Sequence, residues 1–468
     1  MTIYFTEKKV NCKIYIIIIK FTKNIINDLK KYGFDLSNQK FFLEDIKKTM
    51  FTKIYQNDSK LILIDSENKN IYEFLKKNEF HNELNQSKIH LITYTNNLET
   101  LVNYIESILL GNYKFDKYLS RKQFRFKDLY VCLNKITSEK KKYLDNSIKL
   151  FESVSMVRDL GNEPANIMNP DNLSNFIKNL GAKNNFNVTE LKINELKKLN
   201  MNSLISVSQG SKYSARLLIV NKNNKFKTKP IVLVGKGVTF DTGGISLKGP
   251  KNMYDMKGDM IGLSTVLGVI NTLVNTNTNV NVIGVLPIVE NMISMNATRP
   301  GDVVKSMSGK TIEIRNTDAE GRLIMADAIT YSMKFDPKLI IDVATLTGMQ
   351  SSMSCGYYST IMGNDQRIID NMLKIGEKVN ERLWPMPIYD EFKELTKSKI
   401  ADIKNDEFGD CRSSTTLAGA FLSHFVEDKK WIHLDIAGTG YIDNNIYNGS
   451  TGIGVKLLVT FLKNSLNK

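Results

Sequence analysis

The chain has 468 residues, 42% of them hydrophobic, which is enough for a large core and fits two domains best. Its formal net charge is +15, and the first 150 residues hold most of the excess, with 27 Lys and Arg against 17 Asp and Glu. The four scattered cysteines form no CxxC pair, so a disulfide framework and a cysteine-rich zinc site are not expected, and a cytoplasmic setting fits best. The apolar run from Ile14 to Ile19 falls far short of the roughly 20 residues that span a membrane, and no membrane association is predicted.

The basic excess of the N-terminal third has two interpretations. One interpretation is that the basic charge attracts nucleic acid or another acidic surface. Alternatively, it is a solvated face of a chain that is rich in Lys and Asn throughout. We favour the solvated face, because no helix-turn-helix, RNA-binding signature or zinc finger accompanies the charge.

Short apolar runs alternate with helical patterns in the first part of the chain. Runs rich in β-branched residues predict strands, and apolar residues spaced three or four apart predict helices. Strands are predicted at residues 13–21, 60–64, 88–94 and 129–133, and helices at 71–75 and 98–110. We therefore predict an N-terminal α/β domain over residues 1–135.

A longer helical pattern follows, with its apolar residues on one face. It ends in RDLGNEPANIMNP (158–170), where glycine and two prolines break the helix. We predict a connecting helix over residues 136–160 and a second domain over 161–468.

The second part again alternates strands and helices. Strands are predicted at 231–234, 280–286, 338–343 and 431–436, and helices near 255–272, 323–334, 366–380, 415–426 and 453–463. This rhythm predicts a mostly parallel sheet covered by helices on both faces. In such sheets functional groups lie beyond the carboxyl ends of the strands.

Three stretches concentrate charged residues: GKGVTFD (235–241), MYDMKGDM (253–260) and NTDAEGR (316–322). The first comes directly after an apolar strand. In the third, Asp318, Glu320 and Arg322 are spaced i, i+2, i+4, which on an extended segment directs all three to one face. Taken alone, this stretch also fits a capping turn, with Thr317 or Asp318 capping the helix that follows.

The acids of these stretches, Asp241, Asp259, Asp318 and Glu320, repel one another unless cations lie between them. The four histidines have no ligand spacing, so an oxygen-rich site is left, and a charge of about −4 balances two divalent cations. Lys236 can join as a neutral amine, since nearby cations lower the pKa of a lysine. A plain salt bridge at the strand end is the alternative.

The stretches VGKGVTFDTGGISLK, MYDMKGDM, NTDAEGRLIMADA and ATLTG resemble the leucyl aminopeptidase (cytosol aminopeptidase) family of hexameric two-metal enzymes. The resemblance extends from about Arg158 to the end, and the N-terminal third is similar only in size and α/β character. It implies a cytoplasmic homohexamer that hydrolyses the N-terminal residue, leucine or another apolar one, from peptides with a free N-terminus.

The resemblance also implies a role for each residue of the site. Lys236, Asp241, Asp259 and Glu320 match the ligands of the family's tightly held metal. Asp241, Glu320 and Asp318 match the ligands of its exchangeable metal, to which the backbone carbonyl of Asp318 contributes. The two ions are expected to be Zn or Mn, with Mg or Co as alternatives.

Catalytic and substrate-binding roles follow in the same way. Lys248 matches the catalytic lysine, and Arg322 matches the arginine that holds a bicarbonate acting as general base. The residues that match substrate-lining positions are Met256, Asn316, Thr345, Leu346, Gly348 and Ala437.

Two departures from the family concern the substrate side. MQSSMSCGYYSTIMGN (349–364) stands where small apolar residues are usual, and Gly440 stands where a bulkier residue can narrow the side-chain pocket.

Two other function classes stay open. One is a sequence-independent DNA-binding protein, with or without peptidase activity. The other is a two-metal phosphoesterase, which would not need Lys236 as a ligand.

Overall fold

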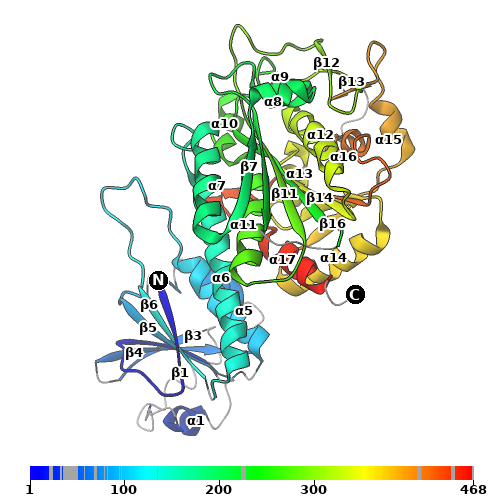
Figure 1. Ribbon diagram of the computed structural model, residues 1–468. Helices are drawn as coiled ribbons and strands as arrows, with labels where there is room; N and C mark the ends of the chain where they lie inside the picture. The colour runs from blue at the N-terminus through cyan, green and yellow to red at the C-terminus, as the bar shows by residue number, and fades with distance from the viewer. Residues whose placement is uncertain are drawn as a thin grey trace. The chain divides into compact units, whose positions relative to one another are not determined.

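The computed structural model describes the chain except residues 20–24, 32–33, 35–50, 57, 68–70, 78–79, 82, 94, 96, 134, 223–227, 408–412, 444–447 and 466–468. The strand ends predicted at 20–21 and 94, and Cys411, lie outside the described residues. The chain forms two compact units, Met1–Phe151 and Glu152–Lys468 (Figure 1). The division falls within helix α6 (Ser138–Asn162). No helix of the described residues is long and apolar enough to cross a membrane.

The N-terminal unit is built on a six-stranded sheet in the order β1-β6-β5-β2-β4-β3, parallel except for the β3–β4 pair. Strand β2 lies inside this sheet and is buried on both faces, which explains its unbroken apolar sequence. The strands are β1 (Thr2–Thr6), β2 (Ile14–Ile19), β3 (Phe51–Gln56), β4 (Ser59–Asp65), β5 (Lys88–Thr93) and β6 (Asp128–Cys132), with helices α1 (Ile25–Lys31), α3 (Ile71–Lys76) and α5 (Leu98–Asn112).

The second unit contains a nine-stranded sheet in the order β16-β15-β18-β14-β9-β11-β8-β7, with β10 also pairing with β11. Its centre, from β18 to β11, is parallel, and antiparallel pairs lie on either side of it. The strands are β7 (Phe186–Leu191), β8 (Arg216–Lys222), β9 (Ile231–Gly235), β10 (Gly237–Asp241), β11 (Val282–Asn291), β14 (Leu339–Ala344), β15 (Ser359–Gly363), β16 (Leu383–Pro385) and β18 (Trp431–Asp435). The predicted mostly parallel sheet is confirmed.

Helices cover both faces of this sheet (Figure 1). On one side α11 (Ile261–Asn275) contacts β9, β11 and β14, and α7 (Pro170–Asn184) and α17 (Val455–Asn464) pack on α11, with α14 (Gln366–Val379) beyond α17. On the other side α12 (Glu320–Ser332) contacts the same strands, and α9 (Asn202–Ser208) and α16 (Ser414–Ser423) pack on α12. Strand β9, IVLVG, lies between the two layers and is fully buried. Its carboxyl end leads directly into the charged stretch 235–248.

Smaller elements lie outside the main sheet. They are β12 (Val303–Lys305), β13 (Thr311–Glu313), β17 (Ile403–Lys404), β19 (Tyr441–Asp443), β20 (Asn448–Ser450), α8 (Ile193–Lys198), α10 (Pro250–Met253), α13 (Gly348–Ser354) and α15 (Asp390–Leu395).

Candidate metal centre and active site

Lys236 and Asp241 lie at the edge of the sheet where its central strands end. Strand β9 stops at Gly235, and β10 runs beside the end of β11. Lys236 therefore lies between two strands, and Asp241 closes the second. Both side chains are buried. The parallel sheet thus delivers an ammonium and a carboxylate to its carboxyl edge, as the strand pattern predicts.

A Gly243-Gly244 turn carries the chain back past Asp241. The two glycines have φ of 86° and 64°, in the left-handed region. A Cβ on Gly243 would lie 2.4 Å from the carbonyl oxygen of Ser246, and one on Gly244 would lie 3.0 Å from Asn291 Oδ1. Glycine is therefore required at both positions, by backbone conformation and by close approach.

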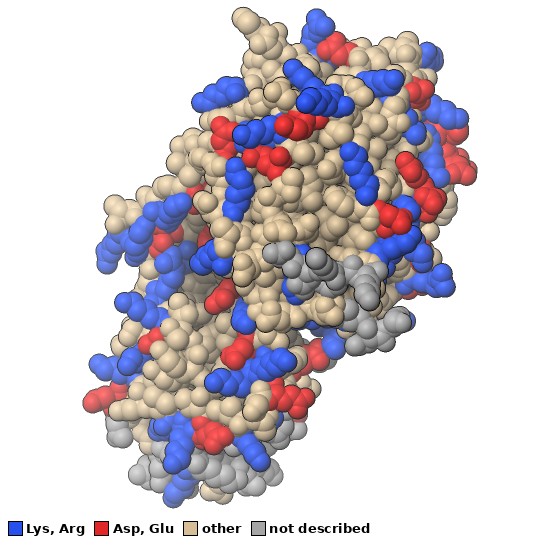
Figure 2. Space-filling view, viewed as in Figure 1, with Lys and Arg blue, Asp and Glu red and all other residues tan. Residues whose placement is uncertain are grey.

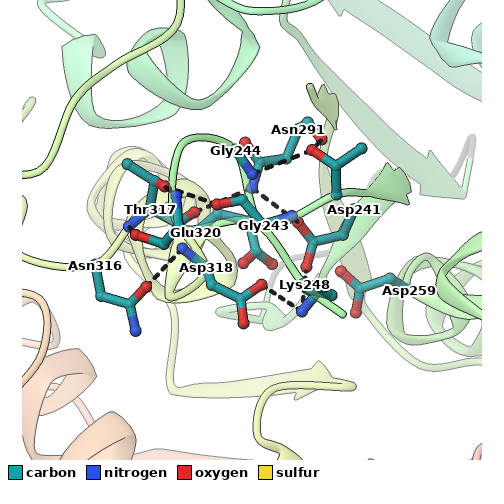
Figure 3. Close-up of polar contacts among 12 residues, drawn as sticks. Asp241, Gly243, Gly244, Lys248, Asp259, Asn291, Asn316, Thr317, Asp318 and Glu320 are labelled. Carbon is teal, nitrogen blue, oxygen red and sulfur yellow. Dashed lines mark hydrogen bonds and ion pairs between the residues drawn. The ribbon is translucent and has the colours of Figure 1, made fainter. Parts of the chain in front are cut away.

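This turn brings Lys248 back beside Asp241. The backbone N–H of Lys248 donates to the carbonyl of Thr242 at 2.9 Å, which fixes the start of the side chain. Its ammonium then lies 2.9 Å from Asp241 Oδ2 and also pairs with Asp318 (Figure 3). Lys248 thus bridges carboxylates from two separate stretches of the chain.

The stretch that carries Asp318, Glu320 and Arg322 is not extended, so that prediction is wrong. Asp318 lies in a turn, and α12 begins at Glu320. The capping alternative is also wrong, because the residue before the helix is Ala319 and no side chain caps it. Residues two apart on a helix point about 200° apart, so Glu320 and Arg322 meet different groups.

The turn before α12 is bound to the loop that carries Lys248. Thr317 Oγ1 donates to the carbonyl of Gly243 at 2.7 Å and accepts the N–H of Ser246 at 2.8 Å. The side-chain oxygen of Asn316 accepts the N–H of Asp318 at 2.9 Å. These bonds hold the acid-bearing turn in place against the glycine turn (Figure 3).

Lys236 gathers three further elements around its ammonium. Its Nζ lies 2.7 Å from Asp259 Oδ1, 2.9 Å from Glu320 Oε1 and 2.9 Å from the carbonyl oxygen of Thr345. Asp259 follows a single 3₁₀ turn (Met256–Gly258), and its Oδ1 also accepts the hydroxyl of Thr345 at 2.8 Å. All three charged stretches identified in the sequence therefore meet at one buried point.

The buried charges shift one another's pKa values. Burial raises the pKa of Asp241 and of Asp259, and the neighbouring carboxylate of Glu320 adds to the rise. Lys248 opposes the rise at Asp241 and Lys236 opposes it at Asp259, whose pKa is raised to about 7 in all. Burial also raises the pKa of Glu320, but Lys236 and Lys248 outweigh it and leave that pKa lowered. Burial lowers the pKa of both lysines, and the surrounding carboxylates outweigh it, so both pKa values are raised.

The carboxylates fit a divalent cation. Asp241, Asp259 and Glu320 each offer an oxygen, and these oxygens all lie within 4.8 Å of one another. Asp259 Oδ2 is buried and has no hydrogen-bond partner in the described part of the chain, so an acceptor is left over inside the cluster. Hard oxygen donors in a compact set suit divalent ions, and the unused oxygen gives such an ion a ligand. Asp318 adjoins the set through Lys248.

Arg322 lies on the far side of the first turn of α12 and is buried. Its Nη1 donates to the carbonyl of Asn405 at 2.6 Å, whereas its Nε is buried and has no partner among the described residues. The Asn405 amide in turn donates to the carbonyl of Asn316 at 2.6 Å and accepts the N–H of Arg315 at 2.8 Å. The free N–H of the guanidinium suits an anion.

Three predicted substrate residues lie on two neighbouring loops. Thr345 and Leu346 follow β14, and Ala437 follows β18, the parallel neighbour of β14. The buried carboxylate of Asp435 accepts the N–H of Leu346 at 3.1 Å, the hydroxyl of Thr347 at 2.7 Å and the N–H of Ala437 at 3.1 Å. One side chain therefore holds both loops together.

The other three predicted substrate residues lie on other segments around the site. Asn316 is half-buried and donates to Asp406 at 2.6 Å. Met256 opens the 3₁₀ turn before Asp259 and is half-buried, whereas Gly348 begins α13 and is exposed. Each lies within three residues of a group already placed at the site.

Sequence reasoning missed three buried residues that support the site: Asn291, Asn405 and Asp435. Asn291 and Asp435 are the last residues of β11 and β18, at the same sheet edge as Asp241, so the carboxyl-end rule would have indicated both. Asn405 follows the two-residue strand β17, and no local pattern marks it.

Comparison with known proteins gives consistent matches. The family model described as "Cytosol aminopeptidase family, catalytic domain" matches residues 155–459. A probable cytosol aminopeptidase of Azoarcus sp. (strain BH72) is 41% identical over 359 residues, 75% of this chain and 71% of the relative. A cytosol aminopeptidase of Pseudomonas aeruginosa (strain PAO1) is 40% identical over 363 residues, 76% of this chain and 73% of the relative.

A solved structure, the bottromycin maturation enzyme BotP in complex with Mn, is similar to this chain with a TM-score of 0.84. The match covers 97% of this chain and 100% of that one, at 24% sequence identity. This likeness concerns the fold.

Proposed function

We propose that this protein removes leucine or another apolar residue from peptides with a free N-terminus, and that it acts in the cytoplasm as a homohexamer. The chain belongs to the cytosol aminopeptidase family and is a metal-dependent hydrolase of the leucyl aminopeptidase type. The observation that carries the proposal is the meeting of the three charged stretches around Lys236, where a buried carboxylate oxygen of Asp259 has no partner from the residues that the structure describes.

The residues that would hold two divalent ions, Zn or Mn, are those of the buried cluster. We assign one ion to Lys236, Asp241, Asp259 and Glu320, and the other to Asp241, Asp318 and Glu320. Support comes from the compact arrangement of three of these carboxylates and from the link that Lys248 makes to Asp318. When bound, two such ions supply Lewis acidity toward a peptide carbonyl and acidify a water.

Lys248 is assigned as the electrophile. It is held at its backbone by Thr242 and at its ammonium by two carboxylates, so its position is set before a substrate arrives. A preorganised cation of this kind stabilises the oxyanion that develops on the carbonyl oxygen during attack. Its raised pKa keeps it charged over the working pH range.

Arg322 is assigned to hold a bicarbonate ion, which would supply a general base for the attacking water. The assignment is supported by the buried Nε, which no described residue contacts by a hydrogen bond, and by the bond that fixes Nη1 to Asn405. Burial lowers the pKa of Arg322, although Asp406, Glu320 and Asp435 oppose this. An arginine keeps its charge even so, because its ordinary pKa lies far above neutrality.

Metal binding would also restrict cleavage to the chain end. The four carboxylates would be balanced by two divalent ions, and one ion would accept the neutral amine of an N-terminal residue, which an internal residue lacks. Gly440 is relevant to the space for the side chain of the substrate's N-terminal residue. A Cβ on Gly440 would lie 3.4 Å from Thr345 Cγ2. Gly440 therefore adjoins a predicted substrate residue, and a larger residue there would press on it.

The test is hydrolysis of chromogenic amides of leucine, alanine and charged amino acids, with and without a chelator. We expect release of apolar residues from free amines, loss of activity on chelation, and recovery with Mn, Zn or Co. An N-acetylated amide and a chromogenic phosphate ester serve as controls and should remain intact. Equal cleavage of the N-acetylated amide would contradict an aminopeptidase, and phosphate-ester cleavage alone would support the phosphoesterase alternative.

A further inference from the structure

Asn291 occupies a central position beside the site without belonging to the set of charged residues. It is the last residue of β11 and lies opposite Asp241, the last residue of β10, in the parallel pair. Its carbonyl oxygen accepts both the N–H and the hydroxyl of Thr242 at 2.9 Å. Asn291 is buried, with 4% of its surface exposed. Its backbone is therefore fixed to the start of the glycine turn.

The side-chain amide of Asn291 joins the two halves of the site. Its Nδ2 donates to Asp241 Oδ1 at 2.8 Å and to the carbonyl oxygen of Thr317 at 3.0 Å (Figure 3). Both partners are acceptors, so only the NH₂ end of the amide can face them. One amide thus connects the end of β10 with the turn that carries Asp318.

These bonds also determine which oxygen of Asp241 faces the site. Asp241 Oδ1 accepts from Asn291 and from the N–H of Gly243, at 2.8 Å each. Oδ2 is the oxygen that contacts Lys248. Two donors on one oxygen fix the plane of the carboxylate and leave the other oxygen directed inward.

We propose that Asn291 is a positioning residue for metal binding. It orients Asp241 and holds the turn of Asp318 at a fixed distance from it. The inference rests on the proposed metal site. Outer partners of metal ligands typically affect metal affinity by on the order of 10–100-fold, because they decide how much reorganisation binding requires.

Asn271 provides a matched control in the same unit. It is a buried asparagine of α11 whose amide donates to Ser153 Oγ at 3.0 Å and whose oxygen accepts from Asn184 at 2.6 Å. It makes the same kind of buried bonds with groups that have no assigned role in the site. Replacing Asn271 therefore measures the cost of losing a buried amide without disturbing Asp241.

The experiment is calorimetric titration of the metal-free full chain with Mn²⁺, together with its melting temperature, for the wild type, Asn291→Leu and Asn271→Leu. Both variants should melt at lower temperature than the wild type. Asn291→Leu should bind Mn²⁺ about 10–100-fold more weakly, and Asn271→Leu should bind as the wild type does. If Asn291→Leu fails to fold, Asn291→Ser fits the same space and has the same expected effect.

Three results separate the claims. Wild-type affinity in the Asn291 variants would overturn the inference and leave the proposed function intact. Equal weakening in Asn271→Leu would show a general effect of lost stability and would also overturn it. A wild-type chain that binds no Mn²⁺, Zn²⁺ or Co²⁺ would overturn the proposed function itself.

Discussion

The two units bury ionisable groups for different purposes. In the N-terminal unit, burial lowers the pKa of His81 and of His90 to about 4, so both are neutral at pH 7. Each bonds a backbone carbonyl, His81 that of Leu75 and His90 that of Val10. At the site in the second unit the buried groups are charged and opposed, with lysines between carboxylates. The difference teaches that the site keeps opposed charges in close contact away from water, whereas these two histidines of the N-terminal unit are buried in the neutral form.

The largest effect on kcat should come from replacing Lys248, the cation that the structure holds most firmly in place. Lys248→Ala should lower kcat for a chromogenic leucine amide by on the order of 10²–10³, because the developing oxyanion loses its electrophile. Metal content, measured by elemental analysis, should stay at the wild-type value. A variant that loses its metal would instead place Lys248 among the residues that hold the ions together.

A smaller loss is expected when the anion-binding group is removed. Arg322→Ala should lower kcat less than Lys248→Ala, because water or another base substitutes in part for a bound bicarbonate. Added bicarbonate should raise the rate of the wild type and of Lys248→Ala, and leave Arg322→Ala unchanged. The division of roles is wrong if Arg322→Ala is the more damaging substitution.

Acidification should change the stability of the two units in opposite directions. In the folded N-terminal unit the pKa of His81 is about 4, below its ordinary 6.5, so stability is lost as the pH falls from about 6.5 toward 4. In the second unit, burial of Asp327 raises its pKa from 3.8 to about 7, so the folded state gains stability as the pH falls through 7. Each effect is on the order of 1–2 kcal/mol between pH 7 and 5.

Hydrogen exchange of the metal-free chain at pH 7 and 5, corrected for the intrinsic rate, measures both units in one sample. Peptides of the N-terminal core should lose protection on acidification, and those of α12 should keep or gain it. His81→Gln should weaken the first response and Asp327→Asn the second. Parallel loss of protection in both units would contradict these assignments.

The weakest expected effect is the binding of DNA by the basic charge of the N-terminal unit. On the face drawn in Figure 2, Lys and Arg side chains are interspersed with Asp and Glu. Gel-shift titrations should therefore show weak binding to DNA that falls steeply with salt and does not depend on sequence. Tight binding of one sequence over bulk DNA at physiological salt would establish a specific reader and overturn this interpretation.

Sequence patterns predicted the central strands of both sheets because continuous burial leaves a clear apolar run, as in β2 and β9. They missed edge strands such as β7, which is only partly buried and therefore carries a mixed sequence. The prediction that residues 318–322 are extended was wrong, because charged residues at every second position also occur where a turn leads into a helix. Asn405 was missed because its partners lie far away in the sequence. Asn291 was missed because its strand was predicted to end at residue 286, whereas β11 continues to Asn291.

The most direct test of the account is the number of divalent ions that one chain binds. Equilibrium dialysis of the metal-free chain against Mn²⁺ or Zn²⁺, followed by elemental analysis, should give two ions per chain for the wild type. Asp259→Asn should bind fewer, because the cluster loses a buried carboxylate. Wild-type protein that binds no ion, or that hydrolyses leucine amides fully when metal-free, would contradict the two-metal site.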